Sequence, residues 1–195
     1  MLRAFFNQRA ATWDETVAEK DMGKLAGMAQ RLEIEPGSTV LDVGTGTGAF
    51  LPVLLDRIGR GGRLVALDIA EEMLRIARAK GFGDNVDYLQ ADVTASPLAN
   101  QVFDTVVCYS TFPHFQDKPR ALDQANRVLK QGGRLFICHT SGRNAINQIH
   151  RQIPTVANDL IPDEMEMREM LSAAGFTGIE VSDEGDSYLA SAAKS

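Results

Sequence analysis

Apolar positions along the chain follow two patterns, short continuous runs and longer stretches with helical spacing. The runs predict strands at Thr39–Val43, Arg63–Leu67, Val86–Gln90, Phe103–Tyr109 and Leu135–Cys138. Between the runs, apolar residues recur three or four positions apart, which predicts helices at Phe50–Ile58, Glu71–Lys80 and around Leu122–Leu129. This alternation predicts an α/β fold, a Rossmann-like doubly wound sheet that is mostly parallel with right-handed crossovers.

The two ends of the chain depart from this alternation. Residues 1–37 have helical character up to a break at Pro36-Gly37, which predicts an N-terminal helical region. Near the other end, Phe176–Ser182 and Ser187–Ala192 are separated by a short acidic turn and predict a β-hairpin. We therefore expect a single domain over residues 1–195 whose sheet closes with an antiparallel pair.

The first predicted strand runs directly into a glycine-rich turn, after which a helical pattern begins. Glycines at such a turn let the backbone approach a ligand closely, because no side chain stands in the way. Open α/β sheets bind small molecules at this end of their strands. We therefore predict a cofactor site formed by Asp42, Gly44, Thr45, Gly46 and Gly48.

The loop alone leaves the identity of its ligand open. Gly44, Gly46 and Ala49 fit the G-x-G-x-x-A pattern of dinucleotide sites. A phosphate loop for ATP or GTP requires Gly-Lys-Ser/Thr, whereas here Gly48 is followed by Ala49. The remaining candidate is S-adenosylmethionine. Asp42 could pair with its ammonium group while loop amides hold its carboxylate.

Two further acids stand at the ends of the second and third predicted strands. Asp68 lies 20 residues beyond Gly48, where an acid is placed to accept ribose hydroxyls, although it could instead cap the next helix. Asp92 could accept the exocyclic amine of adenine beside the Val93 N–H, or serve as a turn acid. Ile69 could flank the adenine or belong to the core. Together these acids indicate an adenosine that is attached to a cationic group.

These features resemble the class I S-adenosylmethionine-dependent methyltransferases, in the small-molecule group that includes the ubiquinone and menaquinone methyltransferases. The matching stretches span roughly residues 35–140 and are Val40–Gly48, Val65–Met73, Asp87–Val93, Phe103–Tyr109 and Arg127–Leu135. Dinucleotide sites lack the Leu-Lys-x-Gly-Gly segment before the fifth strand, in which Gln131 replaces a common proline. The resemblance implies the strand order 3-2-1-4-5-7-6 and adds Tyr109 to the cofactor side.

The activity that the resemblance implies is methyl transfer from S-adenosylmethionine to a small-molecule acceptor by in-line displacement. It divides the chain into an N-terminal helical cap (1–37), a cofactor-binding core (38–139), an acceptor-side segment (140–175) and a C-terminal hairpin (176–195). The short acceptor-side segment favours a small acceptor over protein or tRNA. Two alternatives remain, a nicotinamide-dependent oxidoreductase and a non-catalytic S-adenosylmethionine-binding protein.

The chain has three histidines, His114, His139 and His150, and all fall on the expected acceptor side. They could be packing residues without a chemical role. Alternatively, His114 or His139 could act as a general base or position the substrate. A metal site that uses all three imidazoles is a third possibility, although no tight ligand spacing supports it.

Two other residues are candidates for the acceptor side. Arg143 lies on a polar helical face that could meet an anionic acceptor or simply face solvent. Trp13 has helical spacing with Phe5 and Phe6 and could belong to a lid over the cofactor. It could equally be the anchor that docks the N-terminal helix onto the domain.

Composition narrows the partners and the compartment. The net charge of −6 and the pI of about 5.1 disfavour nucleic acid as a partner. No apolar run is long enough for membrane insertion, and the first residues lack an apolar signal core. Cys108 and Cys138 do not form a disulfide framework and are expected to be buried thiols. We therefore expect a cytoplasmic protein, while the sequence carries no signal for its oligomeric state.

Overall fold

A seven-stranded sheet forms the centre of the computed structural model, which describes residues 2–17 and 19–195. The strands are β1 (Thr39–Val43), β2 (Arg63–Asp68), β3 (Val86–Gln90), β4 (Phe103–Tyr109), β5 (Leu129–His139), β6 (Phe176–Asp183) and β7 (Tyr188–Lys194). Their order is β3-β2-β1-β4-β5-β7-β6. Strands β1 to β5 are parallel, and β7 pairs antiparallel with both β5 and β6. The predicted fold class, strand order and C-terminal hairpin are confirmed.

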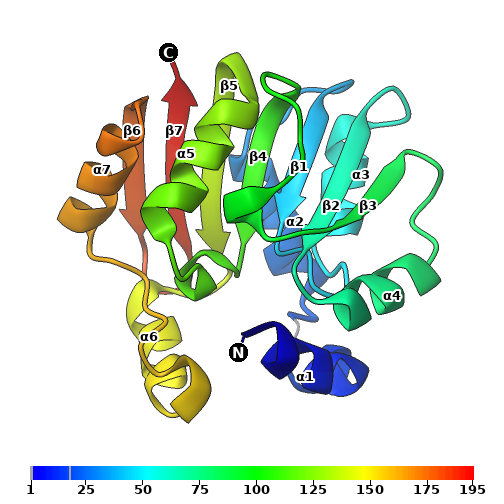
Figure 1. The fold of residues 1–195 in the computed structure, drawn as a ribbon, viewed down its shortest axis with the longest axis vertical. Coiled ribbons are helices and arrows are strands. Elements are labelled where there is room, and N and C mark those ends of the chain that lie inside the picture. Colours follow the sequence, from blue (N-terminus) through cyan, green and yellow to red (C-terminus); the bar gives the residue numbers. More distant parts are fainter. Residues whose placement is uncertain (1, 18) are drawn as a thin grey trace.

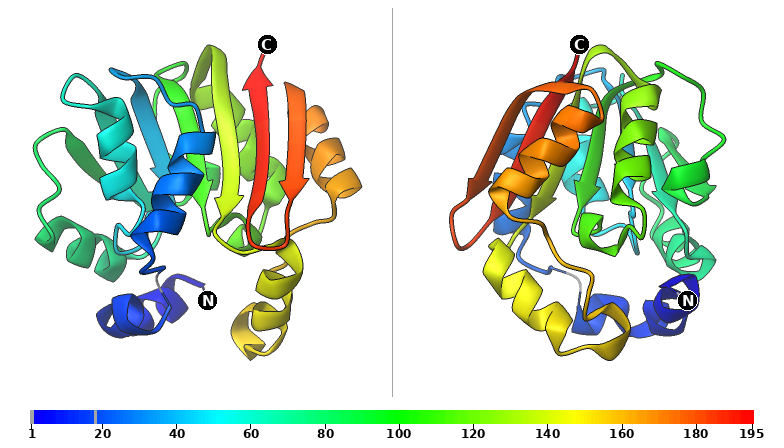
Figure 2. Two further views of the ribbon diagram at one scale, coloured as in Figure 1. Left: turned by 180° about the vertical axis from the view of Figure 1, so that it is seen from behind. Right: turned by 60° about the vertical axis from the view of Figure 1, so that its left-hand side comes forward.

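Helices pack on both faces of the sheet (Figures 1 and 2). The α-helices are α1 (Leu2–Thr16), α2 (Met22–Arg31), α3 (Leu51–Ile58), α4 (Glu71–Ala79), α5 (Lys118–Val128), α6 (Arg143–Arg151) and α7 (Glu164–Ala173). Three short 3₁₀ helices are η1 (Val93–Ala95), η2 (Phe112–His114) and η3 (Pro154–Val156). The first residues of α2, α5 and α7 follow Asp21, Asp117 and Asp163, whose carboxylates accept amide hydrogens of the first turn.

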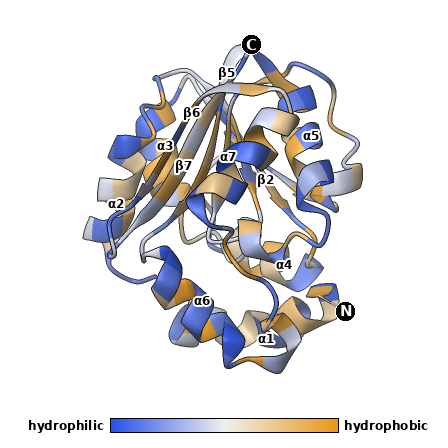
Figure 3. Cartoon of the chain, turned by 90° about the vertical axis from the view of Figure 1, so that its left-hand side faces the viewer, coloured by the Kyte–Doolittle hydropathy of each residue, from blue (hydrophilic) through white to orange (hydrophobic). Residues whose placement is uncertain are grey.

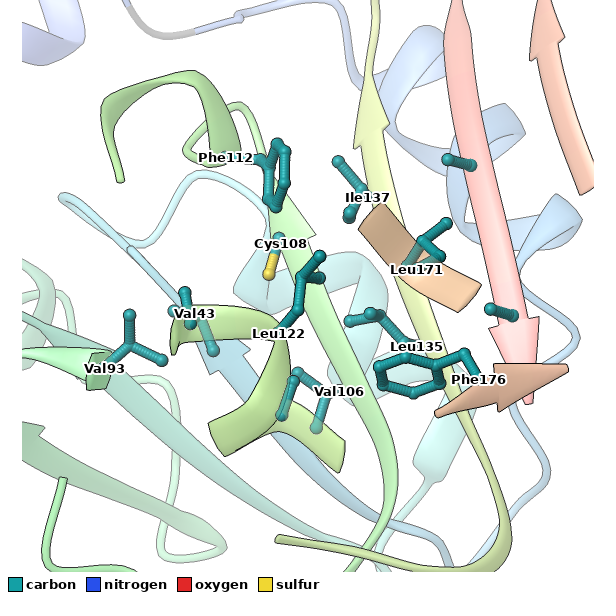
Figure 4. Packing of buried hydrophobic residues seen from close by; sticks show 14 of the residues in the cluster. Val43, Val93, Val106, Cys108, Phe112, Leu122, Leu135, Ile137, Leu171 and Phe176 are labelled. Carbon is teal, nitrogen blue, oxygen red and sulfur yellow. The ribbon is translucent and has the colours of Figure 1, made fainter. Parts of the chain in front are cut away.

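Two apolar clusters on opposite faces of the sheet hold these layers together. On the face covered by α5 and α7, Cys108 and Ile137 pack with Leu122 and Leu171 (Figure 4). The cluster on the face covered by α2 and α3 contains Cys138. Because the two thiols point to opposite faces, they stay unpaired, and burial raises the pKa of each. The expectation of two buried core thiols is confirmed.

Two boundaries differ from the sequence predictions. The N-terminal region is interrupted after Thr16. Helix α2 packs into the core, so α1 is the part of this region that lies beyond the carboxyl ends of the parallel strands. Strand β5 begins at Leu129 rather than Leu135. An irregularity in its pairing with β4 absorbs the Gly132-Gly133 pair, which we had placed before the strand, and Gly132 adopts a positive φ of 73°.

Helices α1 and α6 lie beyond the carboxyl ends of the parallel strands (Figure 1). In Figure 3, both helices carry hydrophobic as well as hydrophilic stretches. Such mixed surfaces suit helices that cover a ligand on one side and meet solvent on the other. Among the described residues, we find no helix with the length and apolar character required to cross a membrane.

Candidate functional site

A cavity of about 680 Å³ opens at the carboxyl ends of the parallel strands. Its walls come from α1, from the glycine-rich loop after β1, from the ends of β2, β4 and β5, and from α6 and η3. Nearly all predicted site residues line it: Trp13, Asp42, Gly44, Thr45, Gly46, Asp68, Ile69, Asp92, Val93, Tyr109, His114, His139 and His150. The volume is within the range of small-molecule sites, and the position is the one at which open α/β sheets bind ligands.

The glycine-rich loop depends on backbone conformations that other residues rarely adopt. Gly44, Gly46 and Gly48 have φ values of 71°, 57° and 84°. A Cβ added to Gly44 would lie 2.0 Å from the Thr111 hydroxyl oxygen, so this glycine is required by packing. A Cβ on Gly46 would have only the Trp13 ring nitrogen nearby, at 4.0 Å, in the space of the cavity. Gly46 is therefore the glycine that keeps room for a ligand.

Four amides of the glycine-rich loop donate hydrogen bonds within the fold. The N–H groups of Gly44 and Thr45 donate to the Leu67 carbonyl, with N···O distances of 2.7 and 3.0 Å. The Gly46 N–H donates to an Asp68 carboxylate oxygen at 2.8 Å. The Gly48 N–H donates to the Thr45 carbonyl at 2.9 Å. These four amides are thus paired within the fold, and the role of the loop amides in holding a ligand carboxylate stays a prediction.

The Asp42 carboxylate is buried, and one of its oxygen atoms lacks a hydrogen-bond partner within the described part of the chain. Its side chain is 2% exposed, and its Oδ2 atom has no hydrogen-bond partner among the described residues. Burial raises its pKa to about 7, and the negative charge of Asp68 adds to this, while the Thr45 hydroxyl acts in the opposite direction. An unpaired buried carboxylate is costly unless a cation approaches it, so Asp42 fits a ligand ammonium group.

The other two predicted acids have partners within the fold. Asp68 is buried and accepts the N–H groups of Gly46 and Ala70, both at 2.8 Å, which leaves further lone pairs for a ligand. Burial raises its pKa. Asp92 is exposed, is the cap of η1 and accepts the N–H and hydroxyl of Thr94 at 2.9 and 2.7 Å. Asp92 thus has the local turn role that the sequence left open as an alternative to adenine binding, although it also lines the cavity.

A polar chain crosses the cavity from Tyr109 to the segment that follows α1. The Tyr109 ring stacks on Phe50 with a centroid distance of 4.3 Å, and its hydroxyl lies 3.0 Å from the Thr140 hydroxyl. Thr140 in turn donates to the Glu19 carboxylate at 3.3 Å. Burial raises the pKa of Tyr109 to about 12, so its hydroxyl stays neutral. Sequence reasoning missed Thr140 and Glu19, which are joined only by the tertiary fold.

The structure brings the three histidines to the same end of the cavity. The rings of His114 and His150 have centroids 4.8 Å apart. Nδ1 of His114 lies 2.9 Å from a carboxylate oxygen of Asp159, and Nδ1 of His150 contacts the main-chain carbonyl of the same residue. Asp159 was not predicted, since no local pattern marks it.

His139 differs from the other two histidines because it is buried. Its side chain is 4% exposed, and Nε2 has no partner among the described residues. Burial lowers its pKa to about 3, and the nearby His114 and His150 lower it further. His139 is therefore neutral at neutral pH and suited to hydrogen bonding rather than to storing a proton.

The metal hypothesis gains no support from this arrangement. Within the described part of the chain, no three His, Cys, Asp or Glu side chains lie where they could share a metal ion. Two of the imidazoles use Nδ1 to contact Asp159. The geometry therefore favours the interpretations in which the histidines pack, position or transfer protons.

Of the two other predicted acceptor-side residues, Trp13 lines the cavity and Arg143 does not. Arg143 is not part of the cavity wall, because it begins α6 beside the hairpin, where its N–H donates to Asp183 at 3.1 Å. Of the two alternatives for Arg143, this position agrees with the solvent-facing one, and later residues of α6 form the wall. Trp13 lines the cavity and packs edge-on against Phe6 with a centroid distance of 5.7 Å.

Helix α1 is held over the glycine-rich loop by polar contacts at its end. Asp14 accepts the hydroxyl hydrogen of Thr47 at 2.5 Å and pairs with Lys80 at 2.7 Å. At the other end, Arg3 pairs with Glu71 at 2.8 Å. These contacts connect α1 to both the loop and α4, so the helix closes one side of the cavity.

Comparisons with known proteins agree on one family. Residues 41–137 match the family described as methyltransferase domain. The chain is 38% identical over 112 residues to the ubiquinone/menaquinone biosynthesis C-methyltransferase UbiE of Teredinibacter turnerae, a match that covers 55% of this chain and 45% of that protein. It is 30% identical over 174 residues to the protein of the same name from Escherichia coli, covering 75% of this chain and 69% of that one.

A solved structure gives the same result. The crystal structure of a SAM-dependent methyltransferase from Aquifex aeolicus superposes with a TM-score of 0.74 and 25% sequence identity, over 93% of this chain and 96% of that one. By contrast, the chain spans less than half the length of the Teredinibacter relative. The family match over residues 41–137 includes the loop after β1 and strands β2 to β4.

Proposed function

The chain belongs to the S-adenosylmethionine-dependent methyltransferases of the methyltransferase domain family, and from this premise we propose that it methylates a small, mostly apolar acceptor. The cofactor part of the proposal is carried by the unpaired, buried Asp42 beside the glycine-rich loop, and the acceptor part by the mostly apolar cavity wall between α1 and α6. It supplies a negative charge where a ligand with an ammonium group is expected. Nothing within the described fold satisfies that charge.

The carboxyl ends of β1 to β3 form the cofactor side of the cavity. When bound, S-adenosylmethionine supplies a methyl group on a positively charged sulfur. In our proposal, Asp42 pairs with the cofactor ammonium and Asp68 accepts ribose hydroxyls. Asp92 and Val93 meet the adenine edge beside Ile69, and Gly46 leaves space for close approach.

The acceptor side lies between α1 and α6. Its walls include the apolar residues Phe6, Ile146, Ile149, Ile153 and Val156. His114 and His150 are the polar groups there, and His114 is the proposed base for an acceptor that arrives protonated. The neutral His139 is proposed to position the acceptor by a hydrogen bond. Much of the rate enhancement is expected from holding the reacting atoms in line.

The two alternatives make different predictions. A nicotinamide-dependent oxidoreductase would bind another ligand, and a non-catalytic S-adenosylmethionine-binding protein would catalyse no reaction. Isothermal titration of the chain with S-adenosylhomocysteine and, separately, with NADH distinguishes the first, because a nicotinamide-dependent oxidoreductase binds NADH. A panel of phenols, quinols, thiols and amines, assayed for methyl transfer, tests the second. We expect S-adenosylhomocysteine to bind and NADH not to bind, with transfer to at least one panel member. Binding without any transfer would favour a non-catalytic protein. The cytoplasmic location stays a prediction.

A further inference from the structure

Asp159 lies behind the histidines of the acceptor side, where it contacts both His114 and His150. It lies in the loop between η3 and α7 and is 8% exposed. One carboxylate oxygen lies 2.9 Å from Nδ1 of His114, and the other is 3.5 Å from Nε2 of Gln116. The cap of α7 is Asp163, not Asp159. Its carboxylate is therefore committed to the imidazole rather than to a helix end.

Both partners of this pair are held in place by other contacts. The side-chain amide of Asn147 on α6 donates to the Ile161 carbonyl at 3.0 Å and accepts the Ile161 N–H at 2.9 Å, which fixes the loop that carries Asp159. Lys118 donates to the two main-chain carbonyls that flank His114, at 2.8 and 3.1 Å. The hydrogen bond between His114 and Asp159 therefore joins two rigid segments.

We propose that Asp159 is a positioning residue that fixes the tautomer of His114. Its carboxylate accepts the Nδ1–H of His114, which leaves the Nε2 lone pair free for the proton of an acceptor. Its main-chain carbonyl accepts the Nδ1–H of His150 and so sets the same tautomer there. The inference rests on the proposed methyltransferase function, because only a proton-releasing acceptor requires a base.

In the proposed step, a proton moves from the acceptor to His114 as the methyl group moves to the acceptor. The proton of an acceptor hydroxyl or thiol passes to Nε2 of His114, while the oxygen or sulfur lone pair forms the bond to the methyl carbon. The carbon–sulfur bond of the donor breaks, and its electron pair stays on the departing sulfur. The imidazolium that results is stabilised by the Asp159 carboxylate, as an aspartate does for a catalytic histidine in hydrolases.

Several elements contribute titratable or aromatic groups around His114, and Asp159 contributes a carboxylate. His150 on α6 and His139 on β5 contribute imidazoles, and burial lowers the pKa of each. Lys118 on α5 contributes a positive charge close to Asp159. Phe6 on α1 presents only a ring edge, with centroids 5.1 Å apart. The Asp159 carboxylate is therefore the hydrogen-bond partner that faces Nδ1 of His114.

Nuclear magnetic resonance of the imidazole rings tests the proposal without a known acceptor. Long-range ¹H–¹⁵N spectra of the full chain with S-adenosylhomocysteine contain only three histidines, which single His→Gln variants assign. We expect the Nδ1–H tautomer for His114 in the wild type. In Asp159→Asn, the tautomer of His114 should switch to Nε2–H, because the amide can donate to Nδ1.

Two further variants control for a merely structural effect. Asp163→Asn keeps a good helix cap on the same segment and should leave the His114 spectrum unchanged. Asp159→Glu keeps the charge and should keep the Nδ1–H tautomer, which also serves if Asp159→Asn does not fold. An unchanged His114 tautomer in Asp159→Asn would overturn the proposal. Binding of S-adenosylhomocysteine, measured separately, tests the proposed function. The tautomer of His114 tests the role of Asp159, so either test can fail without the other.

Discussion

The two halves of the cavity are built in different ways. The cofactor side comes from consecutive strand ends, with Asp42, the glycine-rich loop, Asp68 and Asp92 within about fifty residues of one another. The acceptor side combines η2, α6 and the loop before α7, and Asp159 meets His114 across 45 positions of sequence. The comparison teaches that local sequence specifies the cofactor side, whereas tertiary packing specifies the acceptor side.

The largest expected effect concerns the rigid turn on the cofactor side. Gly44→Ala places a Cβ 2.0 Å from the Thr111 hydroxyl oxygen at a positive φ of 71°. We expect the free energy of unfolding to fall by about 3 kcal/mol and affinity for S-adenosylhomocysteine to fall at least ~100-fold. Urea unfolding and isothermal titration measure these changes.

Gly37→Ala is the matched control for this variant. Gly37 also has a positive φ, of 85°, but nothing lies within 4 Å of an added Cβ. It should lose about 1 kcal/mol of stability from backbone strain alone and no affinity for the ligand. Equal losses in the two variants would show that close packing of the loop is not required.

The next effect is the charge of Asp42. Its pKa of about 7 in the free protein means that ionisation is incomplete at neutral pH. Because a ligand ammonium favours the ionised form, wild-type affinity for S-adenosylhomocysteine should rise between pH 5.5 and pH 7.5 and then level off. Asp42→Asn should bind ~10- to 100-fold more weakly at pH 7.5, with a flat pH profile. A parallel pH profile in both proteins would exclude Asp42 as the titrating group.

The same carboxylate predicts a pH-dependent change in stability without ligand. Its folded-state pKa is raised, so its contribution is fully present below the unfolded pKa of about 4 and is lost as pH rises through about 7. At pH 8, Asp42→Asn should therefore be more stable than the wild type by roughly 4 kcal/mol, with little difference at pH 4. Urea unfolding at both pH values measures this, and a less stable Asp42→Asn protein at pH 8 would contradict it.

A smaller effect is expected from the lid. Deletion of residues 1–20 removes α1, including Trp13 and the Asp14 contacts, and should weaken S-adenosylhomocysteine binding by roughly tenfold because one wall of the cavity is lost. Asp14→Asn, which breaks only the exposed pair with Lys80, should cost about two- to threefold. Unchanged affinity after the deletion would show that α1 does not cover the cofactor.

The smallest expected effect separates the two sides most clearly. Ile153→Ala changes the acceptor wall and should leave S-adenosylhomocysteine affinity within about twofold of the wild type. Its effect should appear instead as a raised KM for an acceptor from the panel. A loss of cofactor affinity comparable to that of Asp42→Asn would mean that the two sides are not independent.

The sequence predicts most of the fold because its strands and turns are marked locally. The break after α1 was missed, although Asp21 before Met22 is a recognisable cap whose carboxylate accepts two amide hydrogens of α2. The early start of β5 was missed because a Gly-Gly pair normally indicates a turn, while here it forms an irregular strand.

The candidate site divides along the same line. Asp42 and Asp68 follow from strand ends and spacing, and the structure places both in the cavity wall. Asp159 has no local signal, since it is one polar residue in a loop whose partner lies on another element. Internal pairing of the loop amides was also missed, because it depends on the Leu67 carbonyl of the neighbouring strand.

A crystal structure with bound S-adenosylhomocysteine tests the central claim most directly. We expect the ligand amino group to lie within hydrogen-bond distance of Asp42, with the ribose at Asp68. The sulfur should face the end of the cavity that holds His114 and His139. A ligand bound elsewhere, or bound in this cavity with Asp42 still unpaired, would contradict the account.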